Sequence, residues 1–312
     1  MKILLLLGGY GFLGTNIIKH IDAHLKNQYQ VIVFDKTPIH PKGISFKSVI
    51  KTYAGDFSDS SLLKTIFLEN KIDLVFHSIS TTIPIDSLNA QYDVETNLFP
   101  TLNILNLMVE YHIPDMVYIS SGGAIYGTNG ETKHKEDEDV FPISSYGVVK
   151  LTIEKYLMQY AQLYGLRPLI IRLSNPYGSY HYSMKQGIIN VALTKALRGE
   201  QIEIWGSGND RKDYIYVEDF VKILFTLLNK EVANEIINIA SGQLLSVNEI
   251  VSSIRILEPS LVTHHLEADM HDALHFMLDT SKLHKMLGDY TFRTFQEGLL
   301  ETYKWTKTAM YN

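Results

Sequence analysis

The sequence predicts a doubly wound α/β fold, in which helices cover both faces of a parallel sheet. Two observations predict it: short, continuously apolar runs alternate with amphipathic stretches, and a glycine-rich turn directly follows the first apolar run. Continuously apolar strands are typical of sheets buried on both faces, and strands separated by helices run parallel. The expected fold class is therefore a Rossmann sheet with a smaller, mixed α/β part toward the C-terminus.

The elements follow in order along the chain. The apolar runs expected to form strands are residues 3–7, 31–34, 74–77, 116–120 and 169–173. The stretches with helical periodicity are residues 13–26, 60–70, 97–111 and 146–164. After residue 173 the pattern changes to a turn at 175–178, a helix at 187–197, strands at 202–205 and 214–217, a helix at 220–228 and a strand at 236–239. We expect one domain over residues 1–173, rejoined by residues 217–240, and a second over residues 174–312.

Composition excludes several classes of function. The chain has 312 residues, 46% hydrophobic and 20% charged, with a formal net charge of −6 and no cysteine. An acidic chain lacks the basic footprint of a nucleic-acid partner, and the absence of thiols suits a reducing compartment. The apolar run at residues 3–7 is shorter than the roughly 7–15 residues of a secretory leader, and no stretch approaches the roughly 20 of a membrane span. We therefore expect a cytoplasmic protein.

A glycine-rich turn lies between the first expected strand and helix. The segment GGYGFLG (residues 8–14) allows the backbone to turn tightly and to approach a pyrophosphate, which then lies at the helix N-terminus. Asp35 ends the next strand roughly 20 residues later, where a carboxylate accepts from a ribose 2′-OH and would repel a 2′-phosphate. The alternative is a tight turn with an incidental acid. We predict that the first domain binds NAD, through Gly8, Gly11, Phe12, Leu13, Gly14, Asp35 and Lys36.

Polar residues also follow the expected third strand. Asp56 and Phe57 lie there, in a position to hold the adenine of a dinucleotide. A polar strand end without any ligand explains them equally well.

The candidate catalytic residues lie in the middle of the chain. Ser120 and Ser121 end the fifth expected strand, at the edge of the sheet where ligands bind in such folds. Tyr146 and Lys150 are four residues apart, so they share a helix face. A nearby ammonium favours a phenolate, as does the positive ring of NAD⁺, and so lowers the pKa of a tyrosine toward that of a general base. Such a pair also occurs by chance on helix surfaces, and it gains meaning from the glycine turn and the serines.

Together these motifs resemble the extended short-chain dehydrogenase/reductases, and more closely the nucleotide-sugar epimerase/dehydratase family typified by UDP-glucose 4-epimerase. The resemblance rests on the glycine turn, SSGGAIYG at 120–127 and Tyr146-x-x-x-Lys150. It continues in RLSNPYG at 172–178 and WGSGNDRKDYIYVED at 205–219.

The resemblance implies an NAD-dependent sugar-nucleotide 4-epimerase acting through a 4-keto intermediate, on a UDP-hexose or a UDP-N-acetylhexosamine. Tyr146 would be the base, Lys150 would hold the nicotinamide ribose, and a hydroxyl residue would share the proton path. Further implied cofactor contacts are Ser78, Ile79, Ser80, Asn97, Ser120, Tyr146, Lys150 and Pro176. Implied substrate contacts are Ser121, Gly122, Tyr146, Asn175, Gln186, Gly187, Trp205, Arg211, Lys212 and Asp272.

The sequence departs from the family pattern near the base. Gly122 occupies the usual hydroxyl position, so Ser121 is the expected substitute. Gly123 and Ala124 stand where the dehydratases carry an acid pair, which favours epimerisation over dehydration.

The expected diphosphate contacts differ as well. Lys212 replaces an arginine, with Arg211 beside it, and Asp269 stands where another arginine is expected. His271 and His275 near Asp272 lack a metal-ligand signature, so we predict no metal.

Two other functions remain open from the sequence. One is a keto-sugar reductase or dehydrogenase with exchangeable NAD(H), and the other is a non-enzymatic dinucleotide-sensing protein. Apolar positions at 98–111 and 151–164 indicate a homodimer through two helices of each subunit, although core packing alone gives a similar pattern.

Overall fold

The computed structural model describes residues 1–40, 42–84, 87–127, 133–267 and 275–311. Its internal contacts divide the chain into two compact units. The first unit comprises Met1–Asn129, Asp139–Arg172 and Leu227–Ile237. The second comprises Gly130–Glu138, Leu173–Thr226 and Asn238–Asn312. Within the described part of the chain, no helix is both long and apolar enough to cross a membrane.

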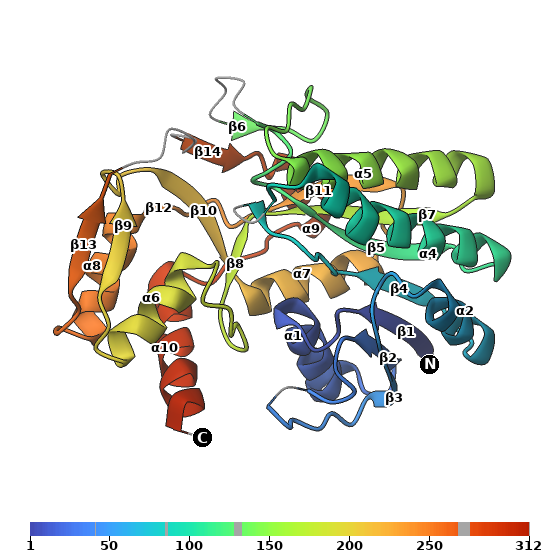
Figure 1. Cartoon of the computed structure of the whole chain (residues 1–312), viewed down its shortest axis with the longest axis horizontal. Coiled ribbons are helices and arrows are strands. Elements are labelled where there is room, and N and C mark those ends of the chain that lie inside the picture. The colour runs from blue at the N-terminus through green and yellow to red at the C-terminus, as the bar shows by residue number, and fades with distance from the viewer. Residues whose placement is uncertain (41, 85–86, 128–132, 268–274, 312) are drawn as a thin grey trace. The chain divides into compact units, whose positions relative to one another are not determined.

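A seven-stranded parallel sheet organises the first unit (Figure 1). Its order is β11-β7-β5-β4-β1-β2-β3. The strands are β1 (Lys2–Leu7), β2 (Tyr29–Asp35), β3 (Val49–Ala54), β4 (Leu74–His77), β5 (Asp115–Ser121), β7 (Arg167–Leu173) and β11 (Glu235–Ile239). The doubly wound α/β fold predicted from the sequence is confirmed.

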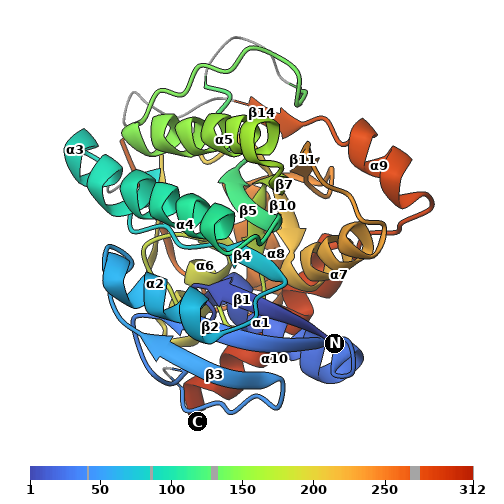
Figure 2. The same ribbon diagram turned by 90° about the vertical axis from the view of Figure 1, so that its right-hand side faces the viewer.

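Helices cover this sheet on both faces. They are α1 (Phe12–His20), continued by a π-helical turn η1 (Ile21–Leu25), α2 (Ser60–Glu69), α3 (Ala90–Asp93), η3 (Val94–Leu98), α4 (Phe99–Glu110) and α5 (Ser145–Tyr164). The apolar faces of α2, α4 and α5 pack with alternate residues of the strands in one buried cluster. Figure 2 shows these three helices on one side of the sheet and α1 on the other.

The order of the strands places the candidate site. The chain leaves β1 in one direction for β2 and β3 and later returns to the other side of β1 through β4. In open parallel sheets, ligands bind at such a switch point, beyond the carboxyl ends of the strands. The residues that follow β1 and β4 are in close contact here. A Cβ added at Gly8, after β1, would lie only 3.1 Å from the Oγ of Ser78, after β4.

The described part of the second unit contains short strands and several helices. Strands β12 (Leu244–Ser246), β10 (Arg211–Tyr216), β14 (His275–Leu278) and β6 (Lys133–His134) form one sheet, and β8 (Asn175–Tyr177) also pairs with β10. Strand β13 (Thr263–Leu266) pairs with β9 (Ile202–Trp205). The helices are α6 (Ile188–Leu197), α8 (Val247–Leu257), α9 (Ser281–Leu287) and α10 (Phe295–Tyr311), and α7 (Val217–Asn229) continues from this unit into the first.

The observed bounds differ from the predicted ones at a few places. The helical stretch expected from residue 97 begins at Ala90, where the side chain of Asn89 accepts from the Tyr92 N–H as a cap. The strand expected at 214–217 begins at Arg211, because polar residues pair with β12 and β14. Hydrophobic periodicity does not detect such polar pairing.

Candidate active site

The glycine turn joins β1 to α1 and excludes side chains. Gly8 has a φ of +84°, a left-handed conformation that favours glycine. A Cβ at Gly14 would lie 2.5 Å from the Gly8 carbonyl oxygen and 2.6 Å from the Gly9 Cα, which no side chain tolerates. Gly11 is the N-cap of α1, and no side chain caps the helix. Bare backbone at a helix N-terminus fits a pyrophosphate.

Asp35 lies at the end of β2 and faces this turn. Its carboxylate accepts from the backbone N–H of Tyr10 at 2.8 Å and from that of Lys36 at 2.8 Å. A carboxylate has about four acceptor positions, so two backbone donors leave capacity for a ribose hydroxyl. The turn and Asp35 therefore fit a dinucleotide, while Lys36 is exposed beside them.

Asp56 and Phe57 follow β3 with separate tasks. The Asp56 carboxylate accepts from the N–H and the hydroxyl of Ser58, at 2.8 and 2.6 Å, and these bonds lower its pKa. Phe57 is buried and packs against the rings of Phe34 and His77. Phe57 therefore contributes to the core, and the adenine contact stays a prediction for both residues.

The loop after β4 is held by a chain of hydrogen bonds. The Ile79 N–H approaches the Nδ1 of buried His77 at 3.3 Å, and the His77 Nε2 lies 2.9 Å from the Thr101 hydroxyl. That hydroxyl donates to the Asn97 carbonyl at 2.6 Å. Burial lowers the pKa of His77 to about 3, with the charge of Lys150 acting in the same direction. His77 is therefore a neutral packing residue and not a base.

Asn97 fixes the same loop from the helical side. Its Oδ1 accepts from the Thr81 N–H at 2.9 Å, and its Nδ2 donates to the Thr81 hydroxyl at 2.7 Å. Both bonds hold the segment that contains Ser80. The structure thus gives Asn97 a positioning contact, and its contact with a cofactor stays a prediction.

Helix α5 presents Tyr146 and Lys150 on one face. Ser144 caps the helix by accepting from the Gly147 N–H at 3.1 Å, and the Tyr146 N–H donates to the Ser87 hydroxyl oxygen at 2.7 Å. The Lys150 Nζ is buried, donates to the Ile119 carbonyl at 2.9 Å and lies 5.7 Å from the centre of the Tyr146 ring. The two side chains are therefore brought together as the spacing predicts.

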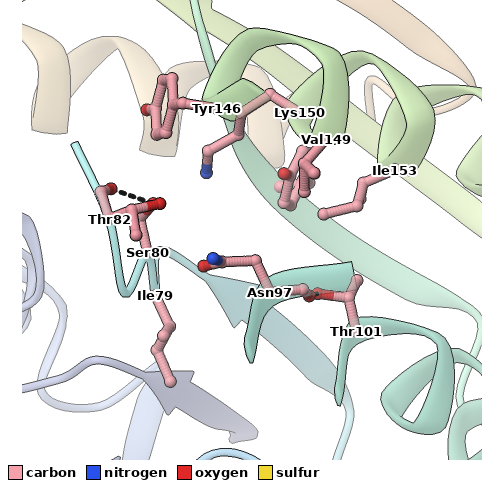
Figure 3. A pocket seen from close by; sticks show the side chains of 10 residues that line it. Ile79, Ser80, Thr82, Asn97, Thr101, Tyr146, Val149, Lys150 and Ile153 are labelled. Carbon is pink, nitrogen blue, oxygen red and sulfur yellow. Dashed lines mark hydrogen bonds between the residues drawn. The ribbon is translucent and has the colours of Figure 1, made fainter. Parts of the chain in front are cut away.

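These side chains line a pocket of the first unit. In Figure 3, Tyr146 and Lys150 extend from α5 toward the loop after β4, with Asn97 and Thr101 on the adjoining helical segment. A hydrogen bond from the Ser80 hydroxyl to the Thr82 carbonyl, 2.8 Å long, closes the loop. The lining residues are Ile79, Ser80, Thr82, Asn97, Thr101, Tyr118, Tyr146, Val149, Lys150 and Ile153.

The pKa of Tyr146 differs from the sequence-based expectation. Burial raises it to about 12, and hydrogen bonds with Ser121 and Ser80 act in the opposite direction. Burial also lowers the pKa of Lys150 to about 8, opposed by the charge of Glu154. In the protein without NAD⁺, burial is the largest cause and Lys150 is not among the causes, so the lowering expected from Lys150 and the positive NAD⁺ ring stays a prediction for the complex with the cofactor.

The end of β5 holds the serines and their glycine neighbours. The Ser121 Oγ accepts from the Ala124 N–H at 3.2 Å, and Ser121 acts against burial to lower the pKa of Tyr146. Ser120 is buried, and its Oγ has no hydrogen-bond partner within the described residues. Gly122 is buried and Gly123 exposed. Ser121 thus lies where the sequence expected a substitute hydroxyl.

The second unit has a pocket with five of the predicted substrate or cofactor contacts: Asn175, Pro176, Gly187, Trp205 and Lys212. Trp205 is 57% exposed, which argues against core filling. Gln186 is not among the lining residues. Arg211 does not line this pocket either. Its guanidinium forms an ion pair with the Glu249 carboxylate at 2.5 Å. Their contacts with a substrate stay predictions.

The remaining predicted residues lie in a segment that the structure does not cover. Asp269, His271 and Asp272 fall outside the described residues. Among the residues that are described, no group of acids and histidines is arranged to hold a metal ion.

Sequence reasoning missed three contacts of this site. Ser80 was expected to meet the cofactor and not the Tyr146 hydroxyl. Tyr118 read as a core residue in an apolar run, yet its ring lies 4.9 Å from the Lys150 Nζ. Ser87 carries no motif at all. Only the serine-rich context of residues 78–80 gave a signal.

Comparison with known proteins agrees with this arrangement. The sequence profile of the NAD dependent epimerase/dehydratase family matches residues 4–240. The chain belongs to this family of NAD-dependent enzymes, and NAD is its cofactor, as the sequence predicts.

Individual relatives span several reactions. A Methanocaldococcus jannaschii protein provisionally named UDP-glucose 4-epimerase is 34% identical over 260 residues, with 81% of each chain covered. A dTDP-glucose 4,6-dehydratase of Haemophilus influenzae is 28% identical, with 98% of each chain covered. The crystal structure of UDP-glucose 4-epimerase from Thermotoga maritima with UDP-glucose has a TM-score of 0.89 at 27% identity, covering 99% of this chain and 100% of that one.

Proposed function

We propose that the protein is an NAD-dependent sugar-nucleotide 4-epimerase, with a UDP-hexose or UDP-N-acetylhexosamine as substrate. The observation that carries the proposal is the position of Tyr146 one helical turn from the buried Lys150, whose Nζ lies 5.7 Å from the Tyr146 ring centre, with Ser121 and Ser80 near enough to oppose the rise in the Tyr146 pKa. Relatives named for UDP-glucose support the choice of substrate.

The residues of the chain divide the work as follows. Tyr146 as phenolate takes the proton from the sugar 4-hydroxyl and returns it after the sugar has turned. Ser121, whose Oγ accepts from the Ala124 N–H, keeps its own proton to donate to the phenolate, and Ser80 would donate as well once its hydroxyl turns away from the Thr82 carbonyl. Lys150, held by the Ile119 carbonyl, binds the nicotinamide ribose. NAD⁺ bound there would supply an acceptor for the hydride of the sugar C4–H, which the turned 4-keto sugar would take back on its other face, and a positive ring that would favour the phenolate.

Epimerisation is preferred over dehydration for a chemical reason. Elimination of water needs an acid and a base beside the sugar. Gly123 and Ala124 offer neither, and no side chain lies within 4 Å of a Cβ placed at Gly123. The alternative is a keto-sugar reductase. The net change in NADH distinguishes the two enzymes, because a reductase consumes NADH and an epimerase leaves the total amount of NADH unchanged.

The test replaces the base. Tyr146→Phe is expected to bind NAD as the wild type does and to lose at least about 10²-fold in epimerisation of UDP-glucose, followed by proton NMR. Tyr160→Phe is the matched control on the same helix, because its hydroxyl donates to the Asn106 Oδ1 at 2.7 Å in an exposed position and does not line the pocket. Turnover of Tyr146→Phe near the wild-type rate would falsify the assignment.

A homodimer through α4 and α5 is also proposed, as the sequence indicates. Leu163 and Tyr164 near the end of α5 are 61% and 56% exposed, and Phe99 at the start of α4 is 58% exposed. These apolar side chains are suited to a subunit contact.

A further inference from the structure

Tyr118 lies in the middle of β5, behind the proposed active site. Its side chain is fully buried, and its hydroxyl has no hydrogen-bond partner within the described residues. The Lys150 Nζ lies 4.9 Å from the centre of its ring. The ring of His77 meets it edge-on, with centroids 5.4 Å apart. The Lys150 ammonium therefore lies over the face of the Tyr118 ring.

Other groups also face the Lys150 charge, among them the Ile119 carbonyl, the more distant Tyr146 ring at 5.7 Å and Glu154. Of its contacts, one is the hydrogen bond to the Ile119 carbonyl. Glu154 lies one helical turn further on, but its carboxylate accepts three bonds from Arg172, at 2.8, 3.1 and 3.3 Å. A buried ammonium is costly unless it is paired, and an aromatic face attracts a cation within about 6 Å.

We propose that Tyr118 is a positioning residue for catalysis, whose ring face keeps the Lys150 side chain charged and in place beside Tyr146. The inference rests on the proposed function, because it takes the Lys150 ammonium as the group that the reaction needs. Nothing in the local sequence assigns this task to Tyr118, which lies within an apolar strand and contributes no motif.

The groups that face Lys150 give its titration a clear assignment. They are Tyr146 and Glu154 on α5, Tyr118 on β5 and His77 on β4. His77 has a pKa of about 3, and burial raises the pKa values of Tyr146 and Tyr118. Of these groups in the protein alone, Lys150 is the one with a pKa near 8, and its own ¹³Cε resonance reports its titration when NAD⁺ is bound.

The test compares an aromatic with two non-aromatic replacements in the full chain with NAD⁺ bound. Lysine labelled with ¹³C at Cε reports the Lys150 titration by NMR, with Lys150→Met identifying its resonance. Tyr118→Phe is expected to keep the midpoint within a few tenths of a pH unit of the wild type. Tyr118→Leu and Tyr118→Met are expected to lower it by about 0.5 to 1.5 units, since a cation–π contact contributes from below 1 to about 2 kcal/mol to the charged state, and one pKa unit corresponds to about 1.4 kcal/mol. If one of the two does not fold, the other decides.

The same variants link the titration to turnover. The alkaline limb of the pH profile of kcat is expected to move to lower pH in Tyr118→Leu and Tyr118→Met and to stay in place in Tyr118→Phe. An unchanged midpoint in both non-aromatic variants overturns the inference, as does an equal shift in Tyr118→Phe. The NMR titration needs no substrate. If the Lys150 midpoint shifts as expected in the Tyr118 variants but the protein has no epimerase activity, the proposed function is refuted and the contact between Tyr118 and Lys150 is not.

Discussion

At the scale of single residues, the site depends on a balance between burial and hydrogen bonding. Burial raises the pKa of Tyr146, and only the hydroxyls of Ser80 and Ser121 oppose it. A hydrogen bond to a charged group contributes roughly 1.5–3 kcal/mol, so each serine has a measurable effect on the phenolate.

Removing either hydroxyl tests this balance. Ser80→Ala and Ser121→Ala are each expected to lower kcat by roughly 10- to 100-fold at neutral pH and to move its acidic limb to higher pH, because the phenolate forms less readily. Steady-state kinetics across pH measure both effects, with Ser61→Ala on exposed α2 as the control. Wild-type kinetics in Ser80→Ala would limit the proton path to Ser121 and Tyr146.

At the scale of elements, a buried ion pair fixes α5 against β7. Arg172 on β7 donates to the Glu154 carboxylate on α5 and to the Tyr126 hydroxyl at 2.9 Å, after β5. Glu154 and Arg172 are 1% and 3% exposed at their side chains. The pair therefore joins the catalytic helix to β7, and Arg172 also joins β7 to the segment after β5.

Breaking the pair is expected to be costly. Arg172→Leu leaves the Glu154 carboxylate buried without its partner, which destabilises the protein by about 3–5 kcal/mol. Arg167→Leu is the matched control on the same strand, because its pair with Asp115 is 45% and 32% exposed and contributes at most about 1 kcal/mol. Urea unfolding of both variants measures the difference. Equal losses in the two variants would show that burial of the Arg172 pair is unimportant. The double variant Glu154→Leu with Arg172→Leu is expected to recover part of the free energy of unfolding that Arg172→Leu loses.

At the scale of the whole molecule, the sequence predicted the fold better than the site. Continuous apolar runs identified β1, β4, β5 and β7 to within one or two residues, since a fully buried strand has few acceptable compositions. The spacing of Tyr146 and Lys150 was equally readable. The contacts of Ser80 and Tyr118 were not, because they join residues from β5, α5 and the loop after β4, which lie side by side only after folding. The rise in the pKa of Tyr146 in the protein alone was not readable for the same reason: burial is a property of the folded chain.

The free energy of unfolding of the whole molecule is expected to depend on pH, because the catalytic Lys150 is buried with its charge. Lys150 has a folded pKa of about 8, against an ordinary value of 10.5. Between pH 8 and 10.5 the unfolded chain binds more protons than the folded chain, so the free energy of unfolding rises with pH in this window. Below pH 8 the buried ammonium lowers the free energy of unfolding by its full cost. Lys150→Met is therefore expected to be more stable than the wild type at pH 7, by roughly 1–3 kcal/mol, with an advantage that shrinks through that window. Urea unfolding at each pH measures it, and exposed Lys155→Met on the same helix should show no such trend. An advantage that stays constant from pH 7 to 10.5 would mean that Lys150 is not held against its own charge, and the tuning of the site would then have to come from Tyr146 and its serines.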